Sequence, residues 1–240
     1  MARIAHVGYG YWGRNIARNM AELGALAAIV DENAAAAGQA ATLYKVPAQS
    51  FDEVLADPGI DGVSLASPAT LHAAQARRAL EAGKHVFVEK PLALDVADAE
   101  ALLKLAEAGP GKLMVGHLLQ YHPVFAELRR MVEAGELGRI RYAYSNRLSL
   151  GKFRNEENVL WSFAPHDLSM VLSLFGEEPS FVAAQGNASF LPGIADFTSV
   201  EMHFPSGGSA HVLSSWMHPF KEQRLVVIGE KAAAVIEDSE

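Results

Sequence analysis

The 240-residue sequence contains no cysteine, which excludes disulfide bonds, thiolate metal sites and cysteine nucleophiles. Its apolar runs are all too short to form a membrane span. The first residues lead directly into a strand pattern, without the basic segment, apolar stretch and cleavage site of a secretory signal. We therefore expect a protein of the cytoplasm that does not enter a membrane.

Basic residues are scarce relative to acidic ones: 20 Lys and Arg stand against 28 Asp and Glu, giving a net charge of −8. This balance argues against broad binding to nucleic acid or to an anionic membrane, although a local basic pocket could still hold a phosphate. The nine histidines include no pair at a spacing typical of metal ligands, so we expect no metal site. Half of the residues are hydrophobic, enough for a substantial core in one or two domains.

Residues 3–31 form the most informative stretch of the chain. A short apolar strand pattern over 4–7 is followed by Gly8, Gly10 and Gly13 in the spacing G-x-G-x-x-G, and then by an amphipathic helix pattern. A second apolar run, 25–30, ends in Asp31. A glycine-rich turn alone also occurs in other α/β proteins, but the strand, the helix and the later acid together favour a dinucleotide site.

Each part of this stretch has a physical role in such a site. Gly8 permits the tight turn, Gly10 lets the backbone approach the pyrophosphate, and Gly13 allows close packing of helix on strand. The helix N-terminus offers free N–H groups to the phosphates. Asp31 can accept hydrogen bonds from the ribose hydroxyls and would repel a 2′-phosphate, which favours NAD over NADP. The cofactor-binding residues expected here are Gly8, Tyr9, Gly10, Tyr11, Trp12, Gly13 and Asp31.

The rest of the first half alternates strand and helix patterns. Strands are expected over 61–66, 85–88 and 112–116, and helices over 32–44, 51–56, 70–82 and 95–108. This order predicts a parallel sheet, whose ligands bind beyond the carboxyl ends of the strands. The same edge should therefore carry further cofactor-binding residues: Ser67, Pro68, His72, Glu89 and Lys90. For His72 a structural role at the start of its helix is an equal alternative.

The pattern changes near Gln120. A helix is expected over 123–134 and another over 166–175, ended by Gly176. Strand-like runs occupy 139–148, 181–189, 198–204, 209–216, 225–228 and 232–236. We predict an α/β chain with a doubly wound, parallel Rossmann domain over 1–120. A domain of α+β type with a mostly antiparallel open sheet should follow over 121–240 and serve substrate binding and oligomerisation.

Two residues have the chemistry for hydride transfer from an alcohol. Lys90 directly follows a buried strand and could polarise a substrate hydroxyl, or it could simply pair with Glu89 at the strand end. His166, in the segment PHD, could accept the hydroxyl proton. If Pro165 begins a helix, the helix N-terminus would lower the pKa of His166. The alternative is a capping or surface histidine beside an ordinary first-turn acid, Asp167.

A polar stretch precedes this helix. Lys152, Arg154 and Asn155 could clamp an anionic substrate, because arginine binds carboxylate and phosphate in a bidentate manner. The alternative is an ordinary solvated loop. Together with Lys90 and His166, these three residues form the expected substrate-binding set.

Three segments resemble the glucose–fructose oxidoreductase/inositol dehydrogenase (Gfo/Idh/MocA) family: VGYGYWGRN, SLASPATLHAAQARRALEAGKHVFVEKPLA and the later PHD. The resemblance covers residues 3 to about 175. It implies an NAD(P)-dependent sugar oxidoreductase that assembles as a homodimer or homotetramer. The family's catalytic lysine and histidine correspond to Lys90 and His166.

Within the family, GYGYWGRN and ENVLWSFAPHD resemble members that oxidise UDP-amino-sugar uronates at the 3-position, as in polysaccharide precursor synthesis. The family often has an aspartate where this chain has Ser162, which implies a different hold on the substrate or a local irregularity. Family members are usually longer, so we expect either a fragment or a shortened member. Alternatives are a dehydrogenase of a free sugar or inositol, a dehydratase or glycosidase that oxidises its substrate transiently, and a non-enzymatic NAD sensor.

Overall fold

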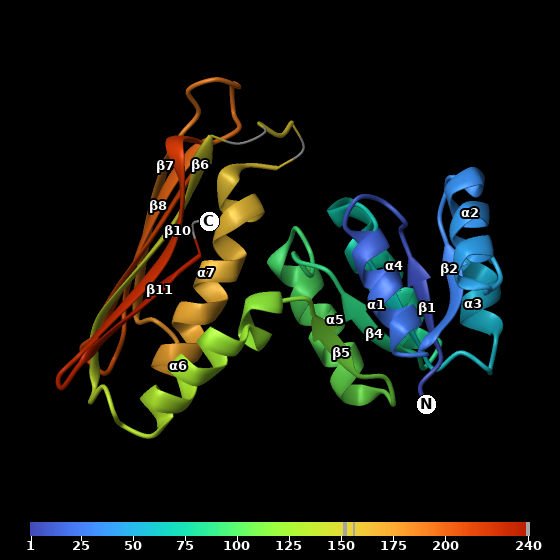
Figure 1. Cartoon of the computed structure of the whole chain (residues 1–240), viewed down its shortest axis with the longest axis horizontal. Coiled ribbons are helices and arrows are strands. Elements are labelled where there is room, and N and C mark those ends of the chain that lie inside the picture. Colours follow the sequence, from blue (N-terminus) through green and yellow to red (C-terminus); the bar gives the residue numbers. More distant parts are fainter. Residues whose placement is uncertain (151–152, 156, 239–240) are drawn as a thin grey trace. The chain divides into compact units, whose positions relative to one another are not determined.

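The structure is a computed structural model that describes residues 1–150, 153–155 and 157–238 (Figure 1). The chain divides into two compact units, Met1–Gly116 and the residues from His117 onward, and each is described by itself. The division expected from the sequence, at residue 120, falls just after this boundary.

The first unit contains a five-stranded sheet in the order β2-β1-β3-β4-β5, with every neighbouring pair parallel. Its strands are β1 (Ile4–Val7), β2 (Leu26–Val30), β3 (Gly62–Leu65), β4 (His85–Val88) and β5 (Leu113–Val115). Its helices are α1 (Gly13–Glu22), α2 (Ala34–Tyr44), α3 (Phe51–Ala56), α4 (Ala69–Glu81) and α5 (Val96–Ala108). The predicted parallel α/β domain is confirmed.

Local signals explain several of these boundaries. Ser50 and Glu53 form the capping box expected at the start of α3, with each side chain bonded to the other residue's backbone N–H. Asn33 caps α2, so that helix begins two residues later than the alanine-rich pattern suggested. The four residues of β3 are all buried, as expected for an inner strand of a parallel sheet.

The second unit contains a six-stranded sheet in the order β11-β10-β6-β9-β8-β7. Its strands are β6 (Ile140–Leu150), β7 (Phe181–Asn187), β8 (Phe197–His203), β9 (Ser209–Ser215), β10 (Met217–Gly229) and β11 (Ala233–Glu237). The pairing is antiparallel except between β6 and β9, which run parallel. The prediction of a mostly antiparallel sheet is confirmed.

The helices of this unit lie along one face of its sheet (Figure 1). They are the 3₁₀ helix η1 (Leu118–Tyr121), α6 (Pro123–Glu133) and α7 (Val159–Phe175). Val171 and Leu174 of α7 pack in one core cluster with Val200 and Val212 of the strands. This cluster fixes the helix against the sheet.

Two expected boundaries in this unit are wrong. Strand β10 begins at Met217 rather than near Leu225, because the polar segment before Leu225 pairs with β6 despite its loop-like composition. Helix α7 begins at Val159 rather than near His166. Asn158 caps it by accepting a hydrogen bond from the backbone N–H of Trp161, and Pro165 lies inside the helix rather than at its start. Across the described part of the chain, no helix is both long and apolar enough to cross a membrane.

Candidate active site

The carboxyl ends of the parallel strands bring the predicted cofactor residues of the first unit together. Backbone hydrogen bonds continue the ladder past the strand ends: Gly8 donates to Val30 O at 2.8 Å, and Glu89 donates to Leu65 O at 2.9 Å. The glycine-rich turn, Asp31, the Ser67–Pro68 loop and the Glu89–Pro91 segment therefore share one edge of the sheet. The topology rule for α/β sheets places ligands there.

The three glycines of the turn differ in whether the fold itself leaves room for a side chain. A Cβ at Gly8, where φ is +93°, would lie 2.7 Å from the backbone of Ala66, and one at Gly13 would lie 1.8 Å from Gly8 O. A Cβ at Gly10 would meet no protein atom within 4 Å. Folding therefore explains two of the glycines, whereas Gly10 leaves an exposed stretch of backbone that a pyrophosphate could approach.

Asp31 is held in place by the turn it faces. Its Oδ2 accepts a hydrogen bond from the backbone N–H of Tyr9 at 2.6 Å, and its Oδ1 accepts one from Asn33 at 2.8 Å. A carboxylate offers about four acceptor sites, so capacity remains for ribose hydroxyls. The residues present thus fit a dinucleotide with a free ribose at this position.

The aromatic residues of the turn divide into two groups. The Tyr9 ring is buried and packs edge-to-face against Tyr44, so Tyr9 reaches the turn through its backbone rather than its phenol. Tyr11 and Trp12 are exposed, with 92% and 44% of their surface accessible. Their side chains are open to a ligand or to solvent.

His6 lies directly beneath this turn on β1 and is completely buried, as a core residue of the sheet should be. Its Nδ1 lies 3.2 Å from Ser64 Oγ. Removal from water lowers its pKa from the ordinary 6.5 to about 4, because burial penalises the charged ring. The turn therefore rests on an uncharged histidine at neutral pH.

His72 makes the contacts expected of a structural residue, which is one of the two roles that the sequence left open. Only 2% of it is exposed, its Nδ1 lies 2.7 Å from Pro91 O, and its Nε2 lies 2.8 Å from Ser67 O. Ser67 Oγ donates to Gln75 Oε1 at 2.5 Å. Pro68 is the N-cap residue of α4. The His72 ring thus faces backbone carbonyls rather than the open edge.

Lys90 is half-buried and lies just beyond the end of β4, separated from the strand by Glu89 alone. The carboxylate of Glu89 packs beside Gly116, where an added Cβ would come within 2.9 Å of Oε1. The Lys90–Pro91 peptide bond is cis. Because it lies just beyond the end of β4, Lys90 stands at the same sheet edge as the glycine-rich turn.

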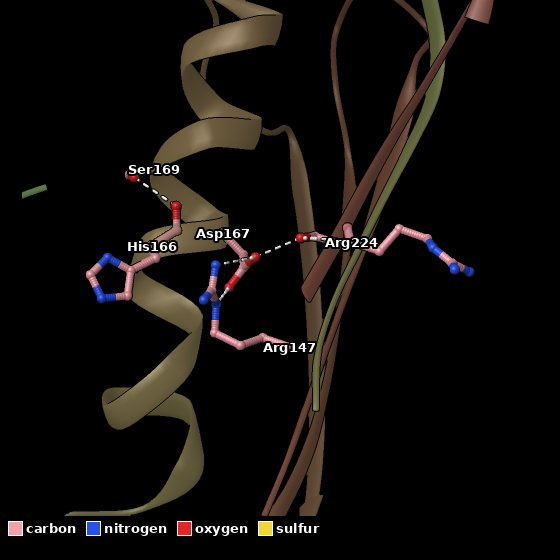
Figure 2. A network of polar contacts seen from close by, with 6 residues as sticks. Arg147, His166, Asp167, Ser169 and Arg224 are labelled. Atoms are coloured by element: carbon pink, nitrogen blue, oxygen red, sulfur yellow. Dashed lines mark hydrogen bonds and ion pairs between the residues drawn. The ribbon is translucent and has the colours of Figure 1, made fainter. Parts of the chain in front are cut away.

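His166 belongs to the second unit and lies well inside α7. The expectation that it lies at a helix N-terminus is wrong, because α7 begins at Val159. Figure 2 shows its imidazole projecting away from the strands, whereas Asp167 projects toward them. Ser169 Oγ donates to the backbone carbonyl of His166 at 2.8 Å.

Asp167 is not an ordinary first-turn acid but the centre of a buried ion pair (Figure 2). It is 1% exposed, and its Oδ2 accepts a hydrogen bond from Arg147 Nε at 2.5 Å. Ser145 Oγ donates to its Oδ1 at 2.6 Å. Two residues of β6 thereby fix the helical position next to His166, an arrangement that the sequence analysis missed. The alternation of Ser145 and Arg147 toward the helix-covered face is the signal that was available.

The predicted anion clamp is only partly described. Arg154 is exposed and forms an ion pair with Glu157, and Asn155 is exposed. Lys152 lies outside the described residues. Ser162, at the position where the family often has an aspartate, is buried in α7. Among the described residues, no group of three His, Asp or Glu side chains could hold a metal ion.

Two family profiles match the chain. Residues 2–117 match the NAD-binding Rossmann-fold domain of an oxidoreductase family, and residues 125–235 match the GFO/IDH/MocA C-terminal domain. The chain belongs to the GFO/IDH/MocA oxidoreductase family. Its first unit is accordingly an NAD-binding Rossmann domain, in agreement with the edge described above.

Similar GFO/IDH/MocA proteins include enzymes for different substrates. A UDP-N-acetylglucosamine 3-dehydrogenase of Acidithiobacillus ferrooxidans is 35% identical over 89% of this chain and 66% of its own length. An inositol 2-dehydrogenase of Rhizobium meliloti is 29% identical over 89% of this chain and 68% of its own length. The chain spans only 52% of a further R. meliloti relative, an uncharacterised oxidoreductase.

Solved GFO/IDH/MocA structures share the whole described architecture. The A. ferrooxidans UDP-N-acetylglucosamine 3-dehydrogenase GnnA superposes with a TM-score of 0.89 at 32% identity, over 98% of this chain and 76% of that one. A putative myo-inositol dehydrogenase of Sinorhizobium meliloti gives a TM-score of 0.91 at 27% identity, over 99% and 76%. Sugar-nucleotide and inositol enzymes therefore share this fold.

Proposed function

We propose that the protein catalyses hydride transfer from a hydroxyl-bearing carbon of a sugar or sugar nucleotide to NAD. The observation that carries the proposal is the shared sheet edge, where an open glycine-rich turn, a backbone-anchored Asp31 and Lys90 lie together. The family's NAD-binding domain supports NAD as the hydride acceptor. The dehydrogenase relatives support a sugar or sugar nucleotide as the hydride donor.

The cofactor proposed is NAD rather than NADP. Asp31 has a carboxylate fixed by two backbone N–H groups, so it cannot easily turn away from a 2′-phosphate that replaces a ribose hydroxyl. Asp31→Ser should weaken the binding of NAD and reduce the ratio of the NADP dissociation constant to the NAD dissociation constant. Titration of the protein with each dinucleotide measures both constants. An unchanged preference would contradict the role of Asp31.

Lys90 and His166 are proposed as the catalytic pair. NAD, when bound, supplies the hydride acceptor. The C–H bond of the substrate breaks with its electron pair as hydride, the C–O bond becomes a carbonyl, and the hydroxyl proton passes to a ring nitrogen of His166. The Lys90 ammonium holds the reacting oxygen and stabilises its developing negative charge.

The substrate proposed is a UDP-amino-sugar uronate. The similarity to a UDP-N-acetylglucosamine 3-dehydrogenase supports a sugar nucleotide. Arg154 supports an acidic group, because a substrate carboxylate could take the place of Glu157 beside the guanidinium. A free polyol is the second candidate, and the inositol dehydrogenase among the relatives favours it.

The first experiment follows reduced nicotinamide by absorbance while the protein reacts with NAD and UDP-N-acetylglucosaminuronate. UDP-N-acetylglucosamine, inositol and glucose serve as alternative substrates. Reduction with the uronate alone supports the proposed substrate, and reduction with inositol or glucose alone selects the second candidate. NAD binding without reduction by any of the four would move the interpretation to a sensor.

Two lysine variants test the catalytic assignment. Lys90→Ala should reduce turnover strongly while NAD affinity stays nearly constant, because the ammonium acts on the substrate oxygen. Lys104→Ala, at an exposed position of α5, is the matched control and should keep full activity. Loss of NAD affinity in Lys90→Ala would contradict its assigned role.

We further propose that the protein works as a homodimer or homotetramer in the cytoplasm. The open sheet of the second unit, which carries its helices on one face, offers the other face for association (Figure 1). Light scattering coupled to size-exclusion chromatography tests this proposal. A monomer at micromolar concentration would contradict it.

A further inference from the structure

We propose that His72 is a positioning residue that fixes the catalytic segment around Lys90, and this inference rests on the function proposed above. The imidazole joins the loop after β3 to the segment after β4. It does so from α4, a helix that contributes no reacting group.

The contacts of His72 are short and shielded from water. Its Nδ1 lies 2.7 Å from the carbonyl oxygen of Pro91, and its Nε2 lies 2.8 Å from that of Ser67. Carbonyl oxygens only accept hydrogen bonds, and a neutral imidazole has one N–H, so a neutral His72 ring donates to one of the two carbonyls and the other contact depends on the tautomer. With 2% of the residue exposed, water cannot readily replace the ring as a donor.

The importance of these contacts follows from the backbone hydrogen bonds of Glu89 and Pro91, the two neighbours of Lys90 in the chain. Before it, the backbone N–H of Glu89 donates to Leu65 O at 2.9 Å and continues the sheet ladder. After it stands Pro91, which has no N–H with which to join the ladder. The carbonyl is therefore the backbone group of Pro91 that can form a hydrogen bond, and His72 contacts it.

The second contact ties the same ring to the glycine-rich turn. The Ser67 backbone N lies 2.7 Å from the place where a Cβ at Gly8 would stand, so the Ser67 loop and the turn are in close contact. Ser67 is also held to α4 through Gln75, at 2.5 Å. His72 thus sets the Lys90 segment relative to a loop that borders the cofactor turn.

The consequence concerns the rate of hydride transfer rather than affinity. Displacing a catalytic group by about 1 Å can cost on the order of 100-fold in rate. If His72 is removed, the Pro91 and Ser67 carbonyls lose the ring that contacts them, and Lys90 gains freedom of movement. The dinucleotide contacts of Gly10 and Asp31 do not involve the ring and should remain.

The experiment compares His72→Phe and His72→Gln with the parent protein and with Val54→Ala. Phenylalanine keeps the planar ring but has no donor, whereas the glutamine amide keeps N–H donors for one of the carbonyls. Val54 is a fully buried core residue of α3, and its truncation destabilises the same unit away from the sheet edge. Turnover is measured with NAD and whichever substrate the first panel identifies.

We expect His72→Phe to lower kcat on the order of 10- to 100-fold, with little change in KM or in the Kd for NAD. His72→Gln should recover part of kcat. Val54→Ala should lower the unfolding temperature but leave kcat unchanged at a temperature where it is folded. If His72→Phe loses activity only in proportion to its unfolded fraction, as Val54→Ala would, the positioning role is overturned.

Hydrogen exchange gives a readout that does not depend on any substrate. In His72→Phe and His72→Gln, amides of residues 89–93 should exchange faster than in the parent, while those of Val54→Ala should keep their protection in this segment. Unchanged exchange at 89–93 overturns the inference. If no substrate is oxidised by the parent protein, the proposed function fails, and the exchange result still decides whether His72 holds the segment.

Discussion

The buried His6 makes the stability of the first unit depend on pH in a defined window. In the folded protein its pKa is about 4, whereas in the unfolded chain it should have the ordinary value near 6.5. Between these values the unfolded chain binds a proton that the folded protein does not bind. Stability is therefore fully present above about pH 6.5 and falls as the pH decreases toward 4.

The magnitude follows from the difference between the two pKa values. Since one pKa unit corresponds to about 1.4 kcal/mol, the complete effect is about 3 kcal/mol in the free energy of unfolding. At pH 4.5 the expected loss relative to pH 7 is about 2 kcal/mol from His6 alone. His6 is completely buried, so solvent screening should not weaken this effect appreciably.

The assay is urea unfolding, followed by circular dichroism at constant ionic strength, for the parent protein and His6→Gln from pH 4.5 to pH 7. Glutamine keeps a polar side chain but does not titrate, and all other titrating groups are shared. The parent should lose about 2 kcal/mol more than the variant over this range. Parallel curves for the two proteins would refute the assigned pKa and the reasoning from burial.

Three further perturbations test other parts of the structure. Gly10→Ala should keep the unfolding temperature but weaken NAD binding. Gly13→Ala should lower the unfolding temperature, because its Cβ would meet Gly8 O. Thermal unfolding and dinucleotide titration of both variants distinguish these two effects. Asp167→Asn removes the counterion of the Arg147 guanidinium and should lower the free energy of unfolding in urea by about 3 kcal/mol. A loss below about 1 kcal/mol would contradict the importance of this ion pair. Ser50→Ala should cost about 1 kcal/mol by the same measurement, because the backbone N–H of Glu53 loses the Ser50 hydroxyl as its acceptor. No change would show that the remaining bond from the backbone N–H of residue 50 to Glu53 is enough to stabilise the helix start.

The first unit could be predicted closely from the sequence because its signals are local. The glycine spacing, the strand patterns and the capping box of Ser50 each depend on a few neighbouring residues. The sheet edge then follows from topology, because parallel strands bring their carboxyl ends together. The position of Asp31 and Lys90 at this edge was predicted in this way without any knowledge of tertiary contacts.

The errors in the second unit arose where tertiary contacts outweigh local patterns. Pro165 suggests a helix start, but the packing of α7 on the sheet extends the helix across the proline to the Asn158 cap, a local signal that the proline outweighed in the prediction. The role of Asp167 depends on Arg147, twenty residues earlier on another element. The alternation of Ser145 and Arg147 indicates that both side chains lie on one face of their strand, but no spacing within the helix identifies Arg147 as the partner of Asp167.

The pairing of β6 has a consequence for how the protein emerges from the ribosome. This strand is flanked by β9 and β10, so both of its partners are made later than itself, and one of them begins only at Ser209. While the intervening segments are synthesised, both edges of β6 lack their native partners, and contacts of such long sequence separation form slowly. Nascent chains that end before β9 should thus be the forms that chaperones bind most readily and that are most prone to aggregate.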